Sequence, residues 1–456
     1  MPGRRYGDRL GGMDSDTRTV NVWLNDYPFP GFLDPVREAA RTFNAAHPGH
    51  EVVIHGHDFR TMPSKVARAV EQGEPPDVAE YLYTSTQLAL DTLGADGERL
   101  FTPIGRALGD RTEVLGEPVL VGDVVPAARD YFRIGGEQWA LPPTASTVVL
   151  YADTGLLKAA GIEALPRTWQ ELETACRAVT ALPDGPAQGV AWPNHVWFLL
   201  QAVAQQGGLI ADRDNGRSGR AEKIDLASPE VLAWVTWWDR LQRDGLYRYS
   251  GKRSDWNSCF EAFGSGQAAF LLSSSVDAAR LIAQGRENGR TVRVGRMPYN
   301  DEVSFAGNMI GGDGLWLRSG LGPATSDTAL AFMQHMVKPE KAAQWHRQNN
   351  RLPITRSSVA LLDEQGWFRE NPDLRVATEQ LDEADGSPAA LGPLLGDFAG
   401  IQKEITQAMH DVLAEGADPV VRFGDATGRA QALLDAYNAG CEGPPRRTPA
   451  NLKVGW

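Results

Sequence analysis

Segments with strand patterns alternate with amphipathic segments at the start of the chain, and this alternation constrains the fold most. Residues 19–24, 51–54 and 78–82 are apolar, or alternate between apolar and polar side chains, as strands do. Between them, the spacing of apolar residues predicts helices over about 35–43 and 63–72. Strands separated by helices in this way build a mostly parallel sheet covered by helices. An α/β fold is therefore predicted.

The chain is too long for one ordinary hydrophobic core. Its 456 residues, 42% hydrophobic and 23% charged, fit a globular protein of two domains. Further helices are expected after Thr168, which begins a capping box, and after Ser228-Pro229. The tryptophans on the second of these helices are expected to pack mostly in a core. The polar, glycine-containing residues 212–220 predict a surface loop.

Charge and hydropathy exclude two classes of partner. The net charge of −13 argues against a surface that follows nucleic-acid phosphates. No apolar stretch approaches the roughly 18 residues of a membrane span. Residues 1–19 are basic and polar and contain no apolar core of a signal peptide. As written, the chain is expected to be cytoplasmic; a removed leader would instead imply an extracellular or cell-surface protein.

The sequence predicts neither a metal site nor a cofactor. Cys176, Cys259 and Cys441 are odd in number and widely spaced, which argues against a disulfide framework or a thiolate site. His55 and His57 have no clear carboxylate partner, so a surface turn is the preferred interpretation. Phosphate-binding loops, nucleophile elbows and zinc-protease motifs are not found in the sequence.

Several motifs follow one another in a recognisable order. They are Thr147–Asp153 (TVVLYAD), Leu165–Leu172 (LPRTWQEL), Phe263–Phe270 (FGSGQAAF), Met297–Tyr299 (MPY), Ile310–Trp316 (IGGDGLW), Val337–Glu340 (VKPE) and Leu352–Thr355 (LPIT). With this order and spacing over about residues 18–440, the chain resembles the extracellular solute-binding proteins of carbohydrate-type ABC transporters. It most resembles the branch that binds glycerol-3-phosphate and glycerophosphodiesters. Each motif alone is weakly specific, but their succession in this order and at this spacing is a specific signal.

The resemblance implies a two-lobed, periplasmic-binding-protein-like α/β fold of type II, with hinge strands between the lobes and a solute held in the cleft. Such clefts are common small-molecule sites, and hinge closure is a common binding motion. The implied lobes are 18–145 with 315–350, and 146–314 with 351–440, flanked by flexible termini at 1–17 and 441–456. The implied hinge crossings lie near 144–148, 312–316 and 351–355.

The resemblance also implies ligand contacts at Ser146, Ser274, Ser275 and Gly312, although capping and turn formation would explain the same residues. Three positions depart from the family pattern. Tyr83 stands where relatives carry an acid, Arg351 where they carry a tyrosine, and Leu394, before Gly396-Asp397, where they carry an arginine. Loss of that arginine removes a natural partner for a phosphate, so glycerol-3-phosphate is disfavoured and another polar ligand is expected.

Aromatic residues suggest a sugar-like or otherwise flat ligand, because their faces pack on apolar sugar faces or on cations such as choline. Core packing is an equal alternative for each. The complete predicted ligand set is Tyr27, Tyr83, Ser146, Trp192, His195, Trp197, Trp256, Ser274, Ser275, Gly312, Asp313, Arg351 and Asp397.

The preferred hypothesis is a solute-binding protein of an ABC-type uptake system that closes on a sugar, polyol or glycerophosphodiester-like molecule. It would act without catalysis, as a monomer, with ABC permease subunits as partners. The alternative is a cytoplasmic biosynthetic enzyme or carrier on the same fold, since fold alone does not fix function. The acid, base or oxyanion roles would then fall to Asp313, Asp397, His195, Arg351 and Tyr83. A sensor with the same closing cleft is a third possibility that the sequence does not separate.

Overall fold

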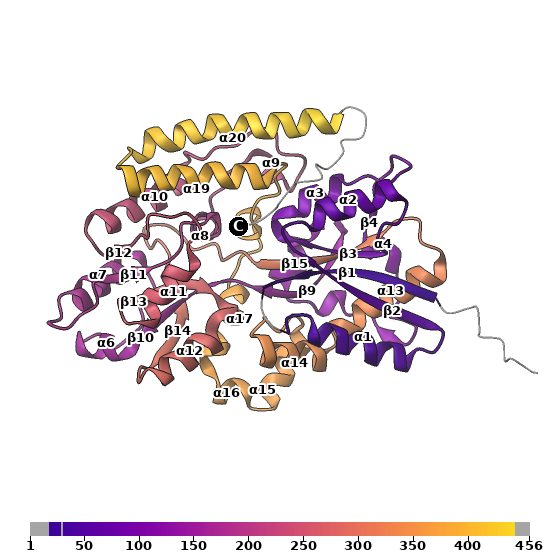
Figure 1. Cartoon of the computed structure of the whole chain (residues 1–456), viewed down its shortest axis with the longest axis horizontal. Coiled ribbons are helices and arrows are strands. Elements are labelled where there is room, and N and C mark those ends of the chain that lie inside the picture. Colours follow the sequence, from indigo (N-terminus) through magenta and orange to yellow (C-terminus); the bar gives the residue numbers. More distant parts are fainter. Residues whose placement is uncertain (1–17, 29–30, 443–456) are drawn as a thin grey trace, which may run out of the picture.

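The computed structural model describes residues 18–28 and 31–442, which form two α/β lobes, each built on its own sheet (Figure 1). Lobe 1 holds the sheet with strand order β2-β1-β3-β15-β4, and β9 also pairs with β15. The strands are β1 (Arg18–Asp26), β2 (His50–Asp58), β3 (Val78–Leu82), β4 (Phe101–Thr102), β9 (Ala140–Ser146) and β15 (Gly311–Arg318).

The parallel arrangement predicted for the first strands is confirmed, because β1 runs parallel to both β2 and β3. The sheet as a whole is mixed, however. Strand β15 pairs antiparallel with β3, β4 and β9. It enters lobe 1 from lobe 2, so its direction is not set by a helical crossover of the kind that makes neighbouring strands parallel.

Lobe 2 holds the sheet with strand order β12-β11-β13-β10-β14. These strands are β10 (Val148–Asp153), β11 (Gln188–Ala191), β12 (Tyr247–Arg248), β13 (Ala268–Ser274) and β14 (Val292–Arg296). Strand β10 is buried along its whole length and pairs antiparallel with β13 and β14. Its nearly unbroken apolar sequence follows from burial on both faces.

Helices cover both sheets. Those of lobe 1 include α1 (Asp34–Ala46), α2 (Met62–Gln72), α3 (Thr86–Asp91), α5 (Pro126–Tyr131), α13 (Pro323–Met336) and α14 (Pro339–Asn349). Those of lobe 2 include α7 (Trp169–Thr180), α8 (Val196–Gln205), α10 (Pro229–Arg243), α11 (Trp256–Gly264), α12 (Ala278–Glu287), α19 (Phe398–Glu415) and α20 (Pro419–Glu442). The predicted caps are present: the Thr168 and Ser228 side chains accept backbone N–H groups of α7 and α10.

The tryptophan cluster forms part of the core of lobe 2. Trp237 on α10 stacks on Trp169, with ring centroids 4.9 Å apart, and lies nearly parallel to Trp192 at 6.0 Å. Trp234 and Trp238 complete the cluster, and all five rings are buried. Core packing, predicted for most of the tryptophans on α10, is confirmed.

The chain crosses between the lobes where β9 continues into β10, and again in the segment that joins β14 to β15. After α14, the backbone N–H of Leu352 donates to Ala145 in lobe 1. Helices α15 (Arg356–Glu364) and α16 (Trp367–Glu370) then follow, with α15 packed on α14, and α17 (Val376–Asp382) lies against β14 of lobe 2. The numerical lobe boundaries stay a prediction.

Buried amides fix the first two crossings to each other. The Gln201 side chain donates to the carbonyl of Met309 at 2.7 Å, and the Thr147 hydroxyl donates to the same oxygen at 3.1 Å. Gln380 donates to the carbonyl of Val148 at 2.8 Å, while Asn308 donates to Gln201 at 2.7 Å. Because a buried polar group without a partner is costly, this network specifies how the two crossings pack.

Candidate functional site

Strands β9 and β15, which lead into the crossings between the lobes, share one face. In the antiparallel pair β9–β15, Gly311 lies opposite Ser146 and Asp313 lies opposite Thr144. Side chains two residues apart on a strand point to the same side, so all four positions share a face. We call Thr144, Ser146, Gly311 and Asp313 the hinge face.

Trp197 of lobe 2 covers one end of the hinge face. A Cβ atom built on Gly311 would stand 2.8 Å from Cζ2 of Trp197 and 3.1 Å from the Ser146 hydroxyl oxygen. Trp197 is positioned by the start of α8, where His195 is the N-cap and its Nδ1 accepts the Trp197 backbone N–H at 3.2 Å. The indole is buried, and its Nε1 has no hydrogen-bond partner.

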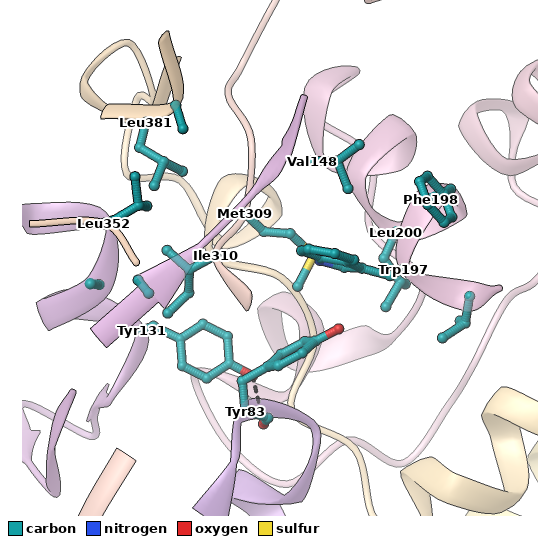
Figure 2. Close-up of a cluster of buried hydrophobic side chains, with 14 of the residues drawn as sticks. Tyr83, Tyr131, Val148, Trp197, Phe198, Leu200, Met309, Ile310, Leu352 and Leu381 are labelled. Atoms are coloured by element: carbon teal, nitrogen blue, oxygen red, sulfur yellow. Dashed lines mark hydrogen bonds between the residues drawn. The ribbon is translucent and has the colours of Figure 1, made fainter. Parts of the chain in front are cut away.

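Tyr83 of lobe 1 lies across from Trp197. It begins a short 3₁₀ segment, Tyr83–Ser85, directly after β3. Figure 2 shows its ring near the indole of Trp197 and beside Tyr131, whose hydroxyl donates to the Tyr83 carbonyl at 2.9 Å. Burial raises the pKa of the Tyr83 hydroxyl well above its usual value, so it remains a neutral hydrogen-bonding group.

A buried polar cluster occupies the other end of the hinge face. Asp313 accepts hydrogen bonds from the Asn25 side chain at 2.8 Å and from the Tyr27 hydroxyl at 2.9 Å. Glu80 accepts the backbone N–H of Asn25 at 2.7 Å. Burial raises the pKa of both carboxyl groups, and the charge of Asp313 raises that of Glu80 further.

Arg351 supplies the positive charge beside these acids. Its guanidinium lies 5.4 Å from the ring centroid of Tyr27 and 5.0 Å from that of Phe32, within reach of cation–π attraction. Its charge opposes the rise in the pKa of Asp313. Arg351, Thr144, Glu80 and Asp313 line a cavity of about 30 Å³. This space suits one or two water molecules, far less than a sugar needs.

Predicted site residues thus fall into two groups that meet at the hinge strands. Tyr83, Ser146, Trp197 and Gly312 lie at one end, since Gly312 follows Gly311 on β15. Tyr27, Asp313 and Arg351 lie at the other. Together they offer aromatic faces, hydroxyl groups, a carboxyl group and a guanidinium, a combination suited to binding a polar organic molecule.

His195 and Trp256 lie together behind the start of α8, with ring centroids 5.8 Å apart. The Nε2 atom of His195 is 2.9 Å from the side-chain amide of Gln402 on α19. Burial lowers the pKa of His195 to about 3, so the imidazole is neutral at physiological pH. His195 therefore holds the start of α8, and with it the backbone of Trp197, from within lobe 2.

The remaining predicted residues have structural surroundings. Trp192 is fully buried among the aromatic rings of lobe 2, so the core alternative describes its position. Ser274 and Ser275 form the turn after β13, where the Ser275 hydroxyl accepts the backbone N–H of Thr147 at 3.2 Å. Asp397 is the N-cap of α19, with a left-handed backbone at φ 43°. For these residues, ligand contact stays a prediction.

The predicted ligand set did not contain three residues of this region, Asn25, Glu80 and Thr144, although Thr144 lies in the hinge crossing predicted at 144–148. Glu80 carried a usable signal, because a carboxylate inside the apolar run 78–82 must be buried with a partner or protonated. Asn25 and Thr144 gave no comparable signal, since their roles depend on pairings between segments far apart in the chain.

Within residues 18–28 and 31–442, no group of three or more His, Cys, Asp or Glu side chains is arranged to hold a metal ion. In the same part of the chain, no helix is long and apolar enough to cross a membrane.

Known proteins share both the sequence and the fold. Residues 38–376 match the model of the bacterial extracellular solute-binding protein family. The sn-glycerol-3-phosphate-binding periplasmic protein UgpB of Salmonella typhimurium is 26% identical over 412 residues, which cover 88% of this chain and 90% of that protein.

Two solved structures superpose on the whole fold. The sugar-binding protein MalE from Xanthomonas citri does so with a TM-score of 0.75 at 18% identity, covering 93% of this chain and 99% of that one. UgpB from Mycobacterium tuberculosis, solved in complex with glycerophosphocholine, has a TM-score of 0.68 at 21% identity, covering 92% and 98%. The predicted two-lobed fold is confirmed, and the chain belongs to the bacterial extracellular solute-binding protein family, as a solute-binding protein of the ABC-transporter type.

Proposed function

We propose that the protein binds one polar organic molecule against its hinge face, between Tyr83 of lobe 1 and Trp197 of lobe 2. The observation that carries this proposal is that these two aromatic side chains, from opposite lobes, lie near each other, with Trp197 packed against Gly311 of the hinge face. A ligand held there touches both lobes at once. Such a ligand favours the closed arrangement through contacts that the open arrangement lacks.

The ligand class follows from the charges of the site. Two buried carboxyl groups, Glu80 and Asp313, face one guanidinium, that of Arg351. A phosphate monoester carries nearly two negative charges, and one guanidinium beside two carboxyl groups offers too little positive charge to balance them. A sugar, polyol or glycerophosphodiester has hydroxyl groups for the carboxyls and at most one negative charge. We therefore expect these compounds, and not free glycerol-3-phosphate.

Two of the three relatives support this range of ligands, whereas the name of the third points to the phosphate monoester that the charges of the site disfavour. UgpB of Salmonella typhimurium is named for sn-glycerol-3-phosphate, UgpB of Mycobacterium tuberculosis was solved with glycerophosphocholine, and MalE is a sugar-binding protein. The trimethylammonium group of a choline ester would suit the faces of Trp197 and Tyr83.

Ligand entry requires the lobes to separate. The cavity of about 30 Å³ at the hinge face is far smaller than a sugar. Hinge motion at the crossings would open the face and then close it around the ligand.

The physiological partners follow from the family. We propose that the protein acts outside the cytoplasmic membrane, as a monomer, and delivers its ligand to ABC permease subunits. Family membership and the similarity to periplasmic proteins support this location.

Isothermal titration calorimetry with maltose, glycerol, glycerophosphocholine and glycerol-3-phosphate tests the proposal. We expect heat from a sugar or from glycerophosphocholine, and its loss in Trp197→Ala. The matched control is Trp367→Ala, because Trp367 lies on α16, away from the hinge face. The proposal would be contradicted if the wild type bound none of these compounds, or if Trp197→Ala bound its ligand with wild-type affinity.

A further inference from the structure

A second set of contacts joins the lobes away from the hinge face, and it contains a charge pair between an arginine and an aspartate. Asp91, the last residue of α3 in lobe 1, accepts hydrogen bonds from both terminal nitrogens of the Arg220 guanidinium, at 2.9 and 2.5 Å. The hydroxyl of Tyr437, on α20 of lobe 2, donates to the same carboxylate at 3.0 Å. We call Asp91, Arg220 and Tyr437 the interlobe lock.

The lock is partly shielded from solvent, which strengthens it. The Asp91 side chain is 11% exposed and that of Arg220 is 34% exposed. A bidentate pair between Arg and a carboxylate is also better oriented than a single contact. Burial and the Asp91 charge raise the pKa of Tyr437 well above its usual value, so its hydroxyl remains a donor. Figure 1 shows α20 reaching from lobe 2 toward α3.

The segment that carries Arg220 is built firmly on lobe 2. Arg213, Asp214 and Asn215 are three consecutive residues in the left-handed region, at φ 52°, 56° and 60°. Such a run is costly and persists only where the surroundings hold it. The side-chain oxygen of Asn215 accepts hydrogen bonds from the backbone N–H groups of Ile210 and Ala211. The backbone carbonyl of Asn215 accepts one from the N–H of Leu394. The surface loop predicted at 212–220 is thus anchored, with Asn215 fully inside the protein.

The same segment makes a second contact with lobe 1. The partly buried guanidinium of Arg217 donates to the carbonyls of Gly392 and Leu391, each at 2.7 Å, and to that of Tyr131 at 3.1 Å. It also lies 4.7 Å from the ring centroid of Tyr131. Tyr131 belongs to lobe 1 and holds the backbone of Tyr83 through its hydroxyl. The anchored segment is therefore linked to the proposed ligand contact.

We infer that the interlobe lock sets how long the lobes stay closed, and so controls ligand affinity without touching the ligand. The inference deepens the proposed function and rests on it for the ligand effect. The lock joins residues that hinge opening must separate, since α3 moves with lobe 1 and α20 moves with lobe 2. Each opening breaks its three hydrogen bonds, so the lock slows opening and ligand release.

Two measurements on Arg220→Ala and the gentler Tyr437→Phe test the inference. Small-angle X-ray scattering without ligand should give a larger radius of gyration than for the wild type. Stopped-flow dissociation of a ligand found by calorimetry should be about tenfold faster for Arg220→Ala, as expected for loss of a charge-assisted hydrogen bond. In the charge-reversed pair, Asp91→Arg with Arg220→Asp, both quantities should return toward the wild-type values.

The matched control is Arg429→Ala. It removes a comparable pair, Arg429 Nε to Glu404 at 2.7 Å, that joins α20 to α19 inside lobe 2. The radius of gyration and the ligand dissociation rate of Arg429→Ala should equal those of the wild type. If a folded Arg220→Ala variant matches the wild type in both measurements, the lock has no role in closure. If the wild type binds none of the ligands, and Arg220→Ala still has a larger radius of gyration, the lock is supported and the proposed function is contradicted.

Discussion

The indole of Trp197 packs directly against the backbone of Gly311, close enough that an added Cβ atom would lie 2.8 Å from Cζ2. Real side chains do not tolerate this distance, so Gly311→Ala must displace Trp197 or the hinge strand. We expect a loss of about 1–3 kcal/mol in the free energy of unfolding, together with weaker ligand binding. Urea denaturation and calorimetry measure the two effects.

The control for this variant is Gly424→Ala on α20. A Cβ atom there meets nothing within 4 Å, and alanine is the better helix former. Stability should be unchanged or slightly higher, with unchanged ligand affinity. Gly311→Ala behaving like Gly424→Ala would contradict the packing described for Trp197.

Tyr131→Phe tests whether the backbone of Tyr83 must be held in place. The variant loses one hydrogen bond, from the Tyr131 hydroxyl to the Tyr83 carbonyl at 2.9 Å, a loss of about 1 kcal/mol. We expect ligand affinity to fall several-fold in calorimetry. Tyr247→Phe is the matched control, because it removes a hydroxyl-to-carbonyl hydrogen bond within lobe 2. An equal loss of affinity in both folded variants would mean that the hydrogen bond to the Tyr83 carbonyl has no specific role in ligand binding.

Much of the fold could be predicted from the sequence because its signals are local. The βα alternation predicted the parallel part of the first sheet, and the capping residues Thr168 and Ser228 predicted the start of two helices. The antiparallel course of β15 carried no local signal. It depends on which lobe the chain leaves before it enters the sheet, and that is a property of the whole topology.

The site was less predictable for a physical reason. Tyr83, Ser146 and Trp197 were predicted through motif resemblance, and their contact with a ligand stays a prediction. A buried polar cluster, by contrast, depends on distant partners. Asn25 and Asp313 are 288 residues apart in the chain, and no pattern in one segment reveals the other. A tryptophan in a core and a tryptophan in a cleft also look alike in a sequence. The core position of Trp192 therefore could not be distinguished from the position of Trp197 beside the hinge face by sequence alone.

Glu80→Gln should change how stability depends on pH. Burial and Asp313 raise the pKa of Glu80 above its ordinary value of 4.5, so the folded protein binds more protons than the unfolded chain above that pH. This contribution is fully present at low pH and is lost as the pH rises through the folded pKa. In the wild type, this titration should lower the free energy of unfolding by up to about 1.4 kcal/mol per pH unit as the pH rises. The variant should lack this decrease.

Urea denaturation at pH 5, 6, 7 and 8 measures this slope. Glu163→Gln is the control, because Glu163 is exposed and its replacement should leave the slope of the wild type. Parallel curves for Glu80→Gln and the wild type would show that Glu80 titrates alike in the folded and unfolded states.

Trp192→Phe separates core packing from ligand contact in the tryptophan cluster. Trp192 is fully buried and lies nearly parallel to Trp237, with ring centroids 6.0 Å apart. The smaller ring leaves a cavity, so we expect the unfolding free energy to fall by about 1–3 kcal/mol. Ligand affinity should stay within about twofold of the wild type at a temperature where both proteins are folded, whereas Trp197→Phe should weaken it. A large loss of affinity in a folded Trp192→Phe variant would place Trp192 in contact with the ligand, because destabilisation alone does not change the affinity of molecules that remain folded.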